Sequence, residues 1–205
     1  MRRSPARSTL AAGLVAFAAA HLIDRWAFRA LAIPGIYDHD WGRALRLVGY
    51  LPVWVVAAGA LVLQDWTSPP GMASPGRWRR GLLLVGAPTV AGILAEALKL
   101  CIRRERPNLT DGAYVFRGWA DHPWSTKDLG LPSSHAVVAF GAATALAHLF
   151  PGARAVWYSL AGACVFTRVA SGAHFVSDVI LGGLLGWLVA ALLGRWSERR
   201  AEVSQ

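Results

Sequence analysis

Apolar residues occur along the chain in six long runs separated by shorter polar segments. Each run is long enough to cross, or nearly to cross, a bilayer, which requires about 20 residues of helix. The runs predict membrane helices over roughly 8–23, 47–63, 81–99, 135–153, 155–170 and 176–194. We therefore predict an all-α fold, a polytopic membrane bundle of six transmembrane helices, with residues 1–205 forming a single membrane-embedded domain.

Two segments of the chain have other interpretations. An arginine-rich start, the stretch "LAAGLVAFAAA" and a small-residue pattern within residues 1–20 also describe a cleaved secretory signal peptide. A retained helix is favoured because the apolar stretch continues through residues 21–23 and because six runs pair more readily than five. The only linker-like segment is "TSPPGMASPG" at 67–76, which is rich in turn-forming residues.

The composition supports a membrane protein. Hydrophobic residues make up 55% of the 205 residues and charged residues only 16%, whereas soluble domains carry about a quarter charged residues. The net charge of +9 comes from Lys and Arg that flank the apolar runs, which favours lipid headgroups as partners and argues against nucleic acid. Lys and Arg are densest in the short segments of one side, so we expect an inside amino terminus in a plasma or inner membrane.

Ionisable residues fall at the ends of four of the runs. Lys99 ends the third run, His135 begins the fourth, Arg168 lies near the end of the fifth, and His174 and Asp178 begin the sixth. In a succession of helical hairpins, the end of one span and the start of the next share a membrane face. The five side chains should therefore meet at one face, the extracytoplasmic one in the favoured orientation, where costly polar residues mark a functional site.

Each cationic residue taken alone also has a structural explanation. Lys99 can reach the interface beside Glu96, and Arg103, Arg104 and Arg106 can form a patch for lipid headgroups. The convergence of several ionisable residues at one depth favours a site over these separate explanations.

The histidines and the aspartate suit covalent catalysis on an anion. His174 and Asp178 are four residues apart and share a face of a helix. The carboxylate can accept the imidazole Nδ1–H and leave Nε2 as a nucleophile or base, a role that we favour over a helix cap. His135 lies at the start of another helix, where it can protonate a leaving group.

The remaining candidate residues suit a tetrahedral oxyanion. Lys99, Arg106 and Arg168 supply positive charge. Ser133 and Ser134 of "PSSH" stand at a helix start, where hydroxyls and backbone N–H groups bind anions. Phosphate is the anion that this set fits.

Metal chemistry and a serine nucleophile are the competing interpretations. A metal ion would have to bind among several Lys and Arg side chains, and the chain has no H-E-x-x-H motif, Cys pair or acidic cluster. The stretch "LPSSHA" is not a G-x-S-x-G elbow. We therefore expect neither a metal ion nor another cofactor.

Three motifs resemble the signature of the phosphatidic acid phosphatase type 2 superfamily, K-x6-R-P, P-S-G-H and S-R-x5-H-x3-D. The corresponding stretches are "KLCIRRERP" (99–107), "PSSH" (132–135) and "TRVASGAHFVSD" (167–178), in the same order and spacing. Ser134 stands in the glycine place and Thr167 in the place of the first serine of the third motif.

The resemblance implies a role for each candidate residue. His174 would be the nucleophile that forms a phosphohistidine, Asp178 would orient it, and His135 would protonate the leaving oxygen. The phosphoryl oxygens would be held by Lys99, Arg106, Ser133, Ser134 and Arg168. Family members with six spans act on lipid phosphates and diphosphates without a metal.

The hypothesis is a membrane-integral, metal-independent lipid phosphatase that hydrolyses a phosphomonoester or diphosphate headgroup, of the phosphatidate, phosphatidylglycerophosphate or polyprenyl diphosphate type. Two alternatives use the same site. One is a phosphotransferase that passes the phosphoryl group from His174 to a lipid acceptor. The other is a non-catalytic lipid-phosphate binder or transporter in which Ser134 blunts turnover.

Overall fold

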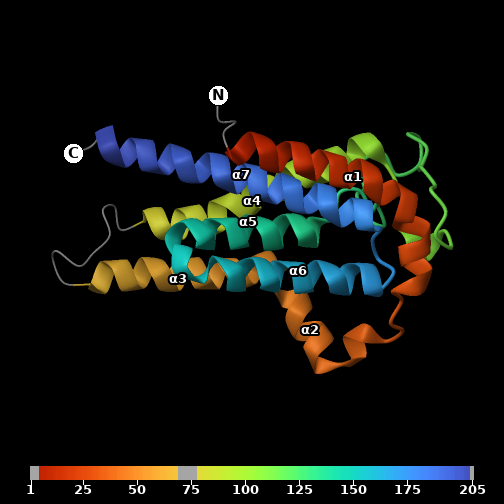
Figure 1. Cartoon of the computed structure of the whole chain (residues 1–205), viewed down its shortest axis with the longest axis horizontal. Helices are drawn as coiled ribbons and strands as arrows, with labels where there is room; N and C mark the ends of the chain where they lie inside the picture. Colours follow the sequence, from red (N-terminus) through yellow and green to blue (C-terminus); the bar gives the residue numbers. More distant parts are fainter. Residues whose placement is uncertain (1–4, 69–77, 204–205) are drawn as a thin grey trace.

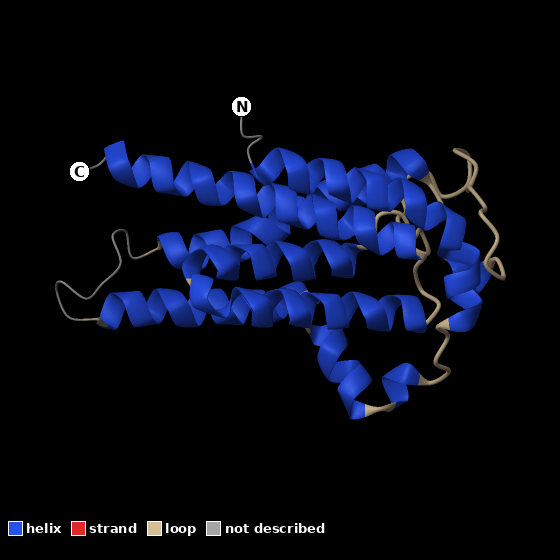
Figure 2. Cartoon of the chain, in the orientation of Figure 1, coloured by secondary structure: helices blue, strands red, loops and turns tan. Residues whose placement is uncertain are grey.

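The computed structural model describes residues 5–68 and 78–203, and this part of the chain is all-α, as predicted. Most of the linker-like segment at 67–76 and the arginines at positions 2 and 3 lie outside the described residues. Figure 2 shows the long helices running side by side, with one short helix projecting from the bundle. The α-helices are α1 (Pro5–Ala30), α2 (Asp40–Leu47), α3 (Leu51–Thr67), α4 (Arg79–Ile102), α5 (Ser134–Leu149), α6 (Arg154–Ala170) and α7 (Val176–Val203), and the 3-10 turns are η1 (Ile36–Asp38), η2 (Pro107–Leu109) and η3 (Pro151–Ala153).

Several helices are long and apolar enough to cross a bilayer. Three segments of the described chain qualify, Ala6–Ala30, Arg79–Ile102 and Val176–Arg199. A fourth span results if α2 and α3, which are bent by 61° at their junction, are taken together. The protein is therefore an integral membrane protein. Helix α5 is a shorter apolar helix of 16 residues, and α6 has 17 residues.

The predicted run at 47–63 is shifted in the structure, where α3 covers Leu51–Thr67, and it is preceded by a sharp bend. The chain bends between α2 and α3, and Pro52 lies in the first turn of α3, where the missing N–H of proline costs no helical hydrogen bond. Gly49 lies in the bend against α5, and a Cβ atom at Gly49 would come within 2.8 Å of His135 Cβ. The close packing of the bend against α5 explains why a single straight span does not form here.

Helix α1 extends beyond the predicted end at residue 23. Ala20, Asp24 and Ala27 form one buried face of this helix, whereas Arg25 and Arg29 are exposed. Because α1 packs along α7, the additional turns continue a packed interface. The hydropathy pattern missed them because the turns carry charged residues.

Helix α5 is the centre of the bundle, between α4, α6 and α7. Its contact with α7 is close because α7 presents glycines. A Cβ atom at Gly186 would lie 2.3 Å from the Val137 carbonyl oxygen, and one at Gly182 would lie 2.7 Å from the Ser133 carbonyl oxygen. This packing fixes the start of α5 beside the start of α7, and the Ser133 amide donates to the Asp178 carbonyl oxygen over 3.1 Å.

Candidate active site

The predicted polar residues lie at one end of the bundle, on the right in Figure 1, where α4 ends and α5 and α7 begin. Lys99, Ser133, Arg168, His174 and Asp178 are almost fully buried there. Arg106, Ser134 and His135 are half-buried. The helix ends therefore bring all eight predicted site residues to the same end of the molecule.

His174 lies in the turn between α6 and α7 with 2% of its surface exposed. Its Nδ1 atom is 3.0 Å from the Gly130 carbonyl oxygen and 3.5 Å from Asp178 Oδ2. The carbonyl oxygen is thus the nearer acceptor, and Asp178 is the second of two groups that orient the ring. Both acceptors assign the proton to Nδ1, which leaves the lone pair of Nε2 for a substrate.

The environment of His174 keeps its imidazole neutral. Burial lowers the pKa of His174 to about 4, against the opposing effect of Asp178. The positive charges of Arg168 and Arg106 contribute to this lowering of the pKa. At neutral pH the imidazole is therefore uncharged, with its proton on Nδ1 and a lone pair on Nε2, close to two cations.

Asp178 has both of the roles that the sequence offered as alternatives. Its Oδ2 atom accepts a 2.8 Å hydrogen bond from the Phe175 amide, which caps the first turn of α7, and the same oxygen faces His174. Its Oδ1 atom is 2.5 Å from Arg104 Nη2. The helix cap that we ranked second is present and does not exclude contact with the imidazole.

Lys99 and Ser134 are connected through Glu96. Lys99 Nζ donates to Glu96 Oε1 over 2.9 Å and also contacts the Ser134 hydroxyl. Ser134 Oγ donates to the same carboxylate oxygen over 2.6 Å. The predicted pairing of Lys99 with Glu96 is present, but Lys99 is buried in the site and does not extend to the membrane interface.

Two residues from the α1–α3 region reach the site without any motif that could have predicted them. Tyr37, in η1, accepts a 2.8 Å hydrogen bond from Arg168 Nη1 and donates to the Thr167 carbonyl oxygen. The guanidinium carbon of Arg46, in α2, lies 4.9 Å from the centre of the Tyr37 ring. Their positions depend on the fold of the α1–α2 connection, which the sequence pattern did not resolve.

His135 shares the electrostatic environment of His174. The charges of Arg168, Arg46 and Arg106 and the imidazole of His174 all act on it. The two imidazoles are therefore neighbours within one cluster of guanidinium groups.

Three buried donors of the predicted phosphate-binding residues have no hydrogen-bond partner among the described residues. These atoms are Ser133 Oγ, Arg106 Nε and Arg168 Nε. Buried polar atoms without partners cost free energy. A tetrahedral oxyanion offers enough acceptor lone pairs for all three donors, so the site is suited to phosphate.

The interpretation of Arg103 and Arg104 as a headgroup patch is wrong. Each is 1% exposed. Arg103 donates to the carbonyl oxygens of Arg117, Gly118, Asp121 and Pro123 over 2.5 to 3.3 Å, and so organises the loop between α4 and α5. Arg104 pairs with Asp178 inside the protein.

The cluster has the composition of an anion site. No three His, Cys, Asp or Glu side chains within 5–68 and 78–203 are grouped to hold a metal ion. The charged neighbours of the two histidines are chiefly arginines, which repel divalent cations.

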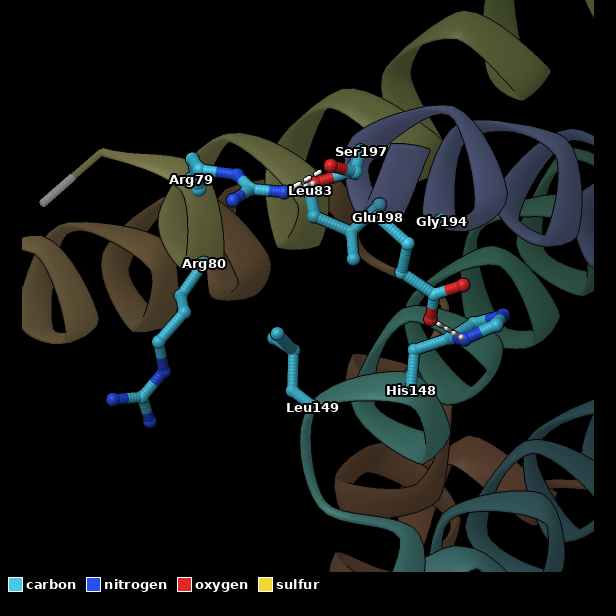
Figure 3. Close-up of a pocket in the computed structure, with 8 residues that line it drawn as sticks. All are labelled: Arg79, Arg80, Leu83, His148, Leu149, Gly194, Ser197 and Glu198. Carbon is cyan, nitrogen blue, oxygen red and sulfur yellow. Dashed lines mark hydrogen bonds and ion pairs between the residues drawn. The ribbon is translucent and has the colours of Figure 1, made fainter. Parts of the chain in front are cut away.

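A separate pocket lies at the opposite end of the bundle (Figure 3), and none of the predicted site residues lines it. Arg79 contacts Ser197 there, and His148 Nδ1 is 3.7 Å from Glu198 Oε1. Arg79 and His148 thus each have a partner on α7.

Comparison with known proteins agrees with this arrangement. The profile of the PAP2 superfamily matches residues 80–202, which include all the predicted site residues. The chain belongs to the PAP2 superfamily. PAP2 membership indicates a phosphoric ester hydrolase of the membrane.

Two PAP2 relatives are informative. The chain is 40% identical to a lipid A 1-phosphatase of Porphyromonas gingivalis over 79 residues, which are 36% of this chain and 17% of that protein. The chain therefore matches less than a fifth of the length of this curated relative. A transmembrane PAP2-type phosphatidylglycerolphosphate phosphatase of Bacillus subtilis has the same fold, with a TM-score of 0.67 and 21% identity over 95% of this chain and 96% of that one.

Proposed function

We propose that this chain is a metal-independent lipid phosphatase that hydrolyses a phosphomonoester or diphosphate headgroup through a phosphohistidine on His174. The observation that carries the proposal is a buried, neutral His174 beside guanidinium groups whose Nε–H donors have no partner among the described residues. Both relatives are named for lipid phosphates as substrates. We extend this substrate class to the present chain.

In the first step, the lone pair of His174 Nε2 attacks phosphorus in line with the bond to the lipid oxygen. The bound phosphate anion offsets the neighbouring guanidinium charges, so that His135 carries a proton in the substrate complex. As the P–N bond forms, the P–O bond breaks and His135 transfers this proton to the departing oxygen. Lys99, Arg106 and Arg168 stabilise the charge on the equatorial oxygens. The Gly130 carbonyl and Asp178 hold the Nδ1–H and stabilise the positive charge that develops on the imidazole.

In the second step, water attacks the phosphohistidine. His135, now neutral, takes a proton from the water, the P–N bond breaks, and its electron pair returns to His174 Nε2. Inorganic phosphate leaves, and both histidines have regained their starting protonation states.

We also propose that α1, α3, α4, α5, α6 and α7 all cross the membrane as one domain over residues 1–205, with the site at the extracytoplasmic face. With 16 residues, α5 spans about 24 Å, less than the 30 Å of hydrocarbon. The start of α5 therefore lies below the membrane surface. This depth places His135 and His174 near the level at which a lipid phosphate joins its hydrocarbon chains.

Phosphate release by the purified protein tests the function. The substrates are phosphatidate, phosphatidylglycerophosphate, a polyprenyl diphosphate and lipid A, each with and without chelator. We expect turnover that the chelator leaves unchanged and that His174→Ala abolishes, together with an acid-labile phosphoenzyme in the wild type. Full turnover by His174→Ala would refute the nucleophile assignment, and turnover lost to chelator would restore the metal interpretation.

A non-catalytic binder is the second candidate, and Ser134 is the observation that favours it. Its hydroxyl contacts both Lys99 and Glu96, so this lysine begins with partners that compete with an anion. Vanadate distinguishes the candidates, because it mimics the trigonal-bipyramidal transition state and binds an enzyme more tightly than it binds a carrier. Transfer of labelled phosphate to an added lipid alcohol would instead identify a phosphotransferase.

A further inference from the structure

Asp24 is a buried carboxylate on α1, outside the region that the PAP2 profile matches. It has only 1% of its surface exposed. Its Oδ1 atom accepts a 2.9 Å hydrogen bond from the Ser177 amide. Its Oδ2 atom accepts from the Tyr114 hydroxyl over 2.6 Å and from the Ser177 hydroxyl. A buried carboxylate on a membrane helix is costly, and these three donors offset that cost.

Ser177 connects Asp24 to the orienting carboxylate of the site. Its hydroxyl oxygen accepts a 2.7 Å hydrogen bond from Arg104 Nη2, and the same nitrogen lies 2.5 Å from Asp178 Oδ1. Asp178 Oδ2 in turn faces His174 Nδ1 at 3.5 Å. A continuous series of buried polar contacts therefore runs from α1 to the imidazole.

Aromatic rings hold the central guanidinium in place. The guanidinium carbon of Arg104 lies 4.8 Å from the centre of the Tyr114 ring and 5.2 Å from that of Phe175. These two rings also contact each other edge to face, with their centres 4.9 Å apart. The contacts restrict Arg104 to the position in which it meets both Ser177 and Asp178.

Asp24 also completes the first turn of α7. The amides of this turn have no acceptor within their own helix. Asp178 accepts from Phe175, and Asp24 accepts from Ser177 across the interface between α1 and α7. His174 directly precedes this turn, so the position of its ring depends on a carboxylate of another helix.

We infer that Asp24 is a positioning residue, which acts through Ser177, Arg104 and Asp178 to hold His174 in line with the phosphorus atom. This inference rests on the proposed function. The cations proposed to hold phosphate are Lys99 in α4, Arg168 in α6 and Arg106, which precedes η2. In the described part of the chain, the hydrogen bonds of Asp24 come from Tyr114 and Ser177 and not from these cations. Loss of Asp24 should therefore impair attack on phosphorus and leave phosphate binding intact.

The test compares Asp24→Ala, Asp24→Asn and Ser177→Ala with Asp40→Asn, which changes an exposed carboxylate on α2 that pairs with Arg43. For Asp24→Ala we expect kcat to fall about 10- to 100-fold, because small displacements of a reacting group cost this much. KM and the Kd of inorganic phosphate should change less than about threefold. Asp24→Asn should lose less, because its amide oxygen still accepts from the Ser177 amide, and Asp40→Asn should retain wild-type kcat.

Two results would overturn the inference. One is wild-type kcat in Asp24→Ala. The other is an equal loss of kcat and phosphate affinity with a lowered melting temperature, which would indicate a role in folding alone. If Asp24→Ala does not fold, Asp24→Asn and Ser177→Ala replace it in the test. A lowered kcat with an unchanged Kd of inorganic phosphate in these variants supports the positioning role, and wild-type kcat in both overturns it.

A second measurement separates this inference from the proposed function. The ¹⁵N NMR shifts of the His174 ring report its tautomer and hydrogen bonds even in a protein without turnover. We expect these shifts to change in Asp24→Ala and Ser177→Ala and to stay at wild-type values in Asp40→Asn. If the wild type releases no phosphate from any lipid, the proposed function fails, and unchanged ring shifts in the Asp24 variants would separately overturn the positioning role.

Discussion

Both ends of the bundle contain buried ionisable side chains, but the two ends differ in which of their polar atoms have no hydrogen-bond partner. At the site end, three buried donor atoms of ionisable side chains have no hydrogen-bond partner in the described chain. They are the Nε atoms of Arg104, Arg106 and Arg168. At the opposite end, the corresponding atom is an acceptor, Oδ2 of Asp65, whose Oδ1 receives a 2.8 Å hydrogen bond from Arg80. Positive charge is present at both ends, so charge alone does not distinguish them.

The difference shows how a phosphate site can be recognised in a very basic protein. Arg80, whose guanidinium pairs with the buried Asp65, contributes mainly to stability, because removing it leaves a buried opposite charge. A cation held by neutral groups, as Arg168 is by Tyr37, retains charge and donors for a ligand. Unpaired donors on cationic side chains therefore locate the site more specifically than the density of Lys and Arg.

The largest expected effect comes from removing a guanidinium at the site end. Arg168→Ala should lower kcat/KM about 10³-fold, because one arginine on a transferring phosphoryl group contributes at least this much. Arg168→Lys should give an intermediate value, since it keeps the charge but loses the planar fork. Phosphate release by both variants measures the effect, and wild-type kcat/KM in Arg168→Ala would remove this residue from the site.

The matched change at the opposite end is Arg80→Ala, which should spare activity and reduce stability. It leaves Asp65, which is 2% exposed, without its ion pair. Breaking a buried pair costs about 3 kcal/mol, partly reduced here because the Arg80 side chain is 22% exposed. Thermal unfolding in detergent measures this loss. A variant that is stable but inactive would contradict the assignment of separate roles to the two ends.

Acid should destabilise the site end through His174. The pKa of this histidine is lowered by burial to about 4, compared with 6.5 in the unfolded chain. The unfolded state therefore binds more protons below pH 6.5, so this contribution is fully present above pH 6.5 and is lost as the pH falls towards 4. At pH 5 the loss is about 2 kcal/mol. Melting temperatures from pH 7.5 to 4.5 should therefore fall more steeply for wild type than for His174→Ala, and parallel curves would contradict the neutral buried imidazole.

The sequence predicted which ionisable residues meet at one end of the bundle better than it predicted the contacts that hold them. Alternating helix ends and the three motifs were sufficient to bring Lys99, Arg168 and His174 together, because hairpin topology leaves few other arrangements. Asp24 and Tyr37 belong to no motif and depend on how α1 and η1 pack against α6 and α7. The Ala20–Asp24–Ala27 spacing was the one local signal, since a polar residue between small residues on one face of a membrane helix indicates a packed partner.

The fold was predictable to a similar degree. The positions of α4 and α6 follow the apolar runs closely, because apolar length determines which segments can enter the bilayer. Helix α7 begins at the predicted residue 176 but continues past the predicted end at 194 to Val203. Helix α2 was missed, because its amphipathic sequence "DWGRALRL" has no long apolar run. The buried roles of Arg103 and Arg104 were also missed, since burial of a cation depends on carbonyl and carboxylate partners that are distant in the sequence.

The smallest effect that we predict comes from removing a hydrogen-bond partner of Lys99 at the site end, which would leave this cation with more unpaired donors. Ser134→Gly restores the glycine of the family motif and removes the hydroxyl that contacts Lys99 and Glu96. Lys99 then has one competing partner fewer, so we expect kcat/KM to rise about three- to tenfold, as for the loss of one charge-assisted hydrogen bond. The matched control, Ser134→Ala, also removes the hydroxyl but keeps a Cβ atom. A gain in both variants assigns the effect to the hydroxyl, a gain in Ser134→Gly alone assigns it to space for the phosphoryl oxygen, and a loss in both would show that Ser134 is itself a phosphate ligand.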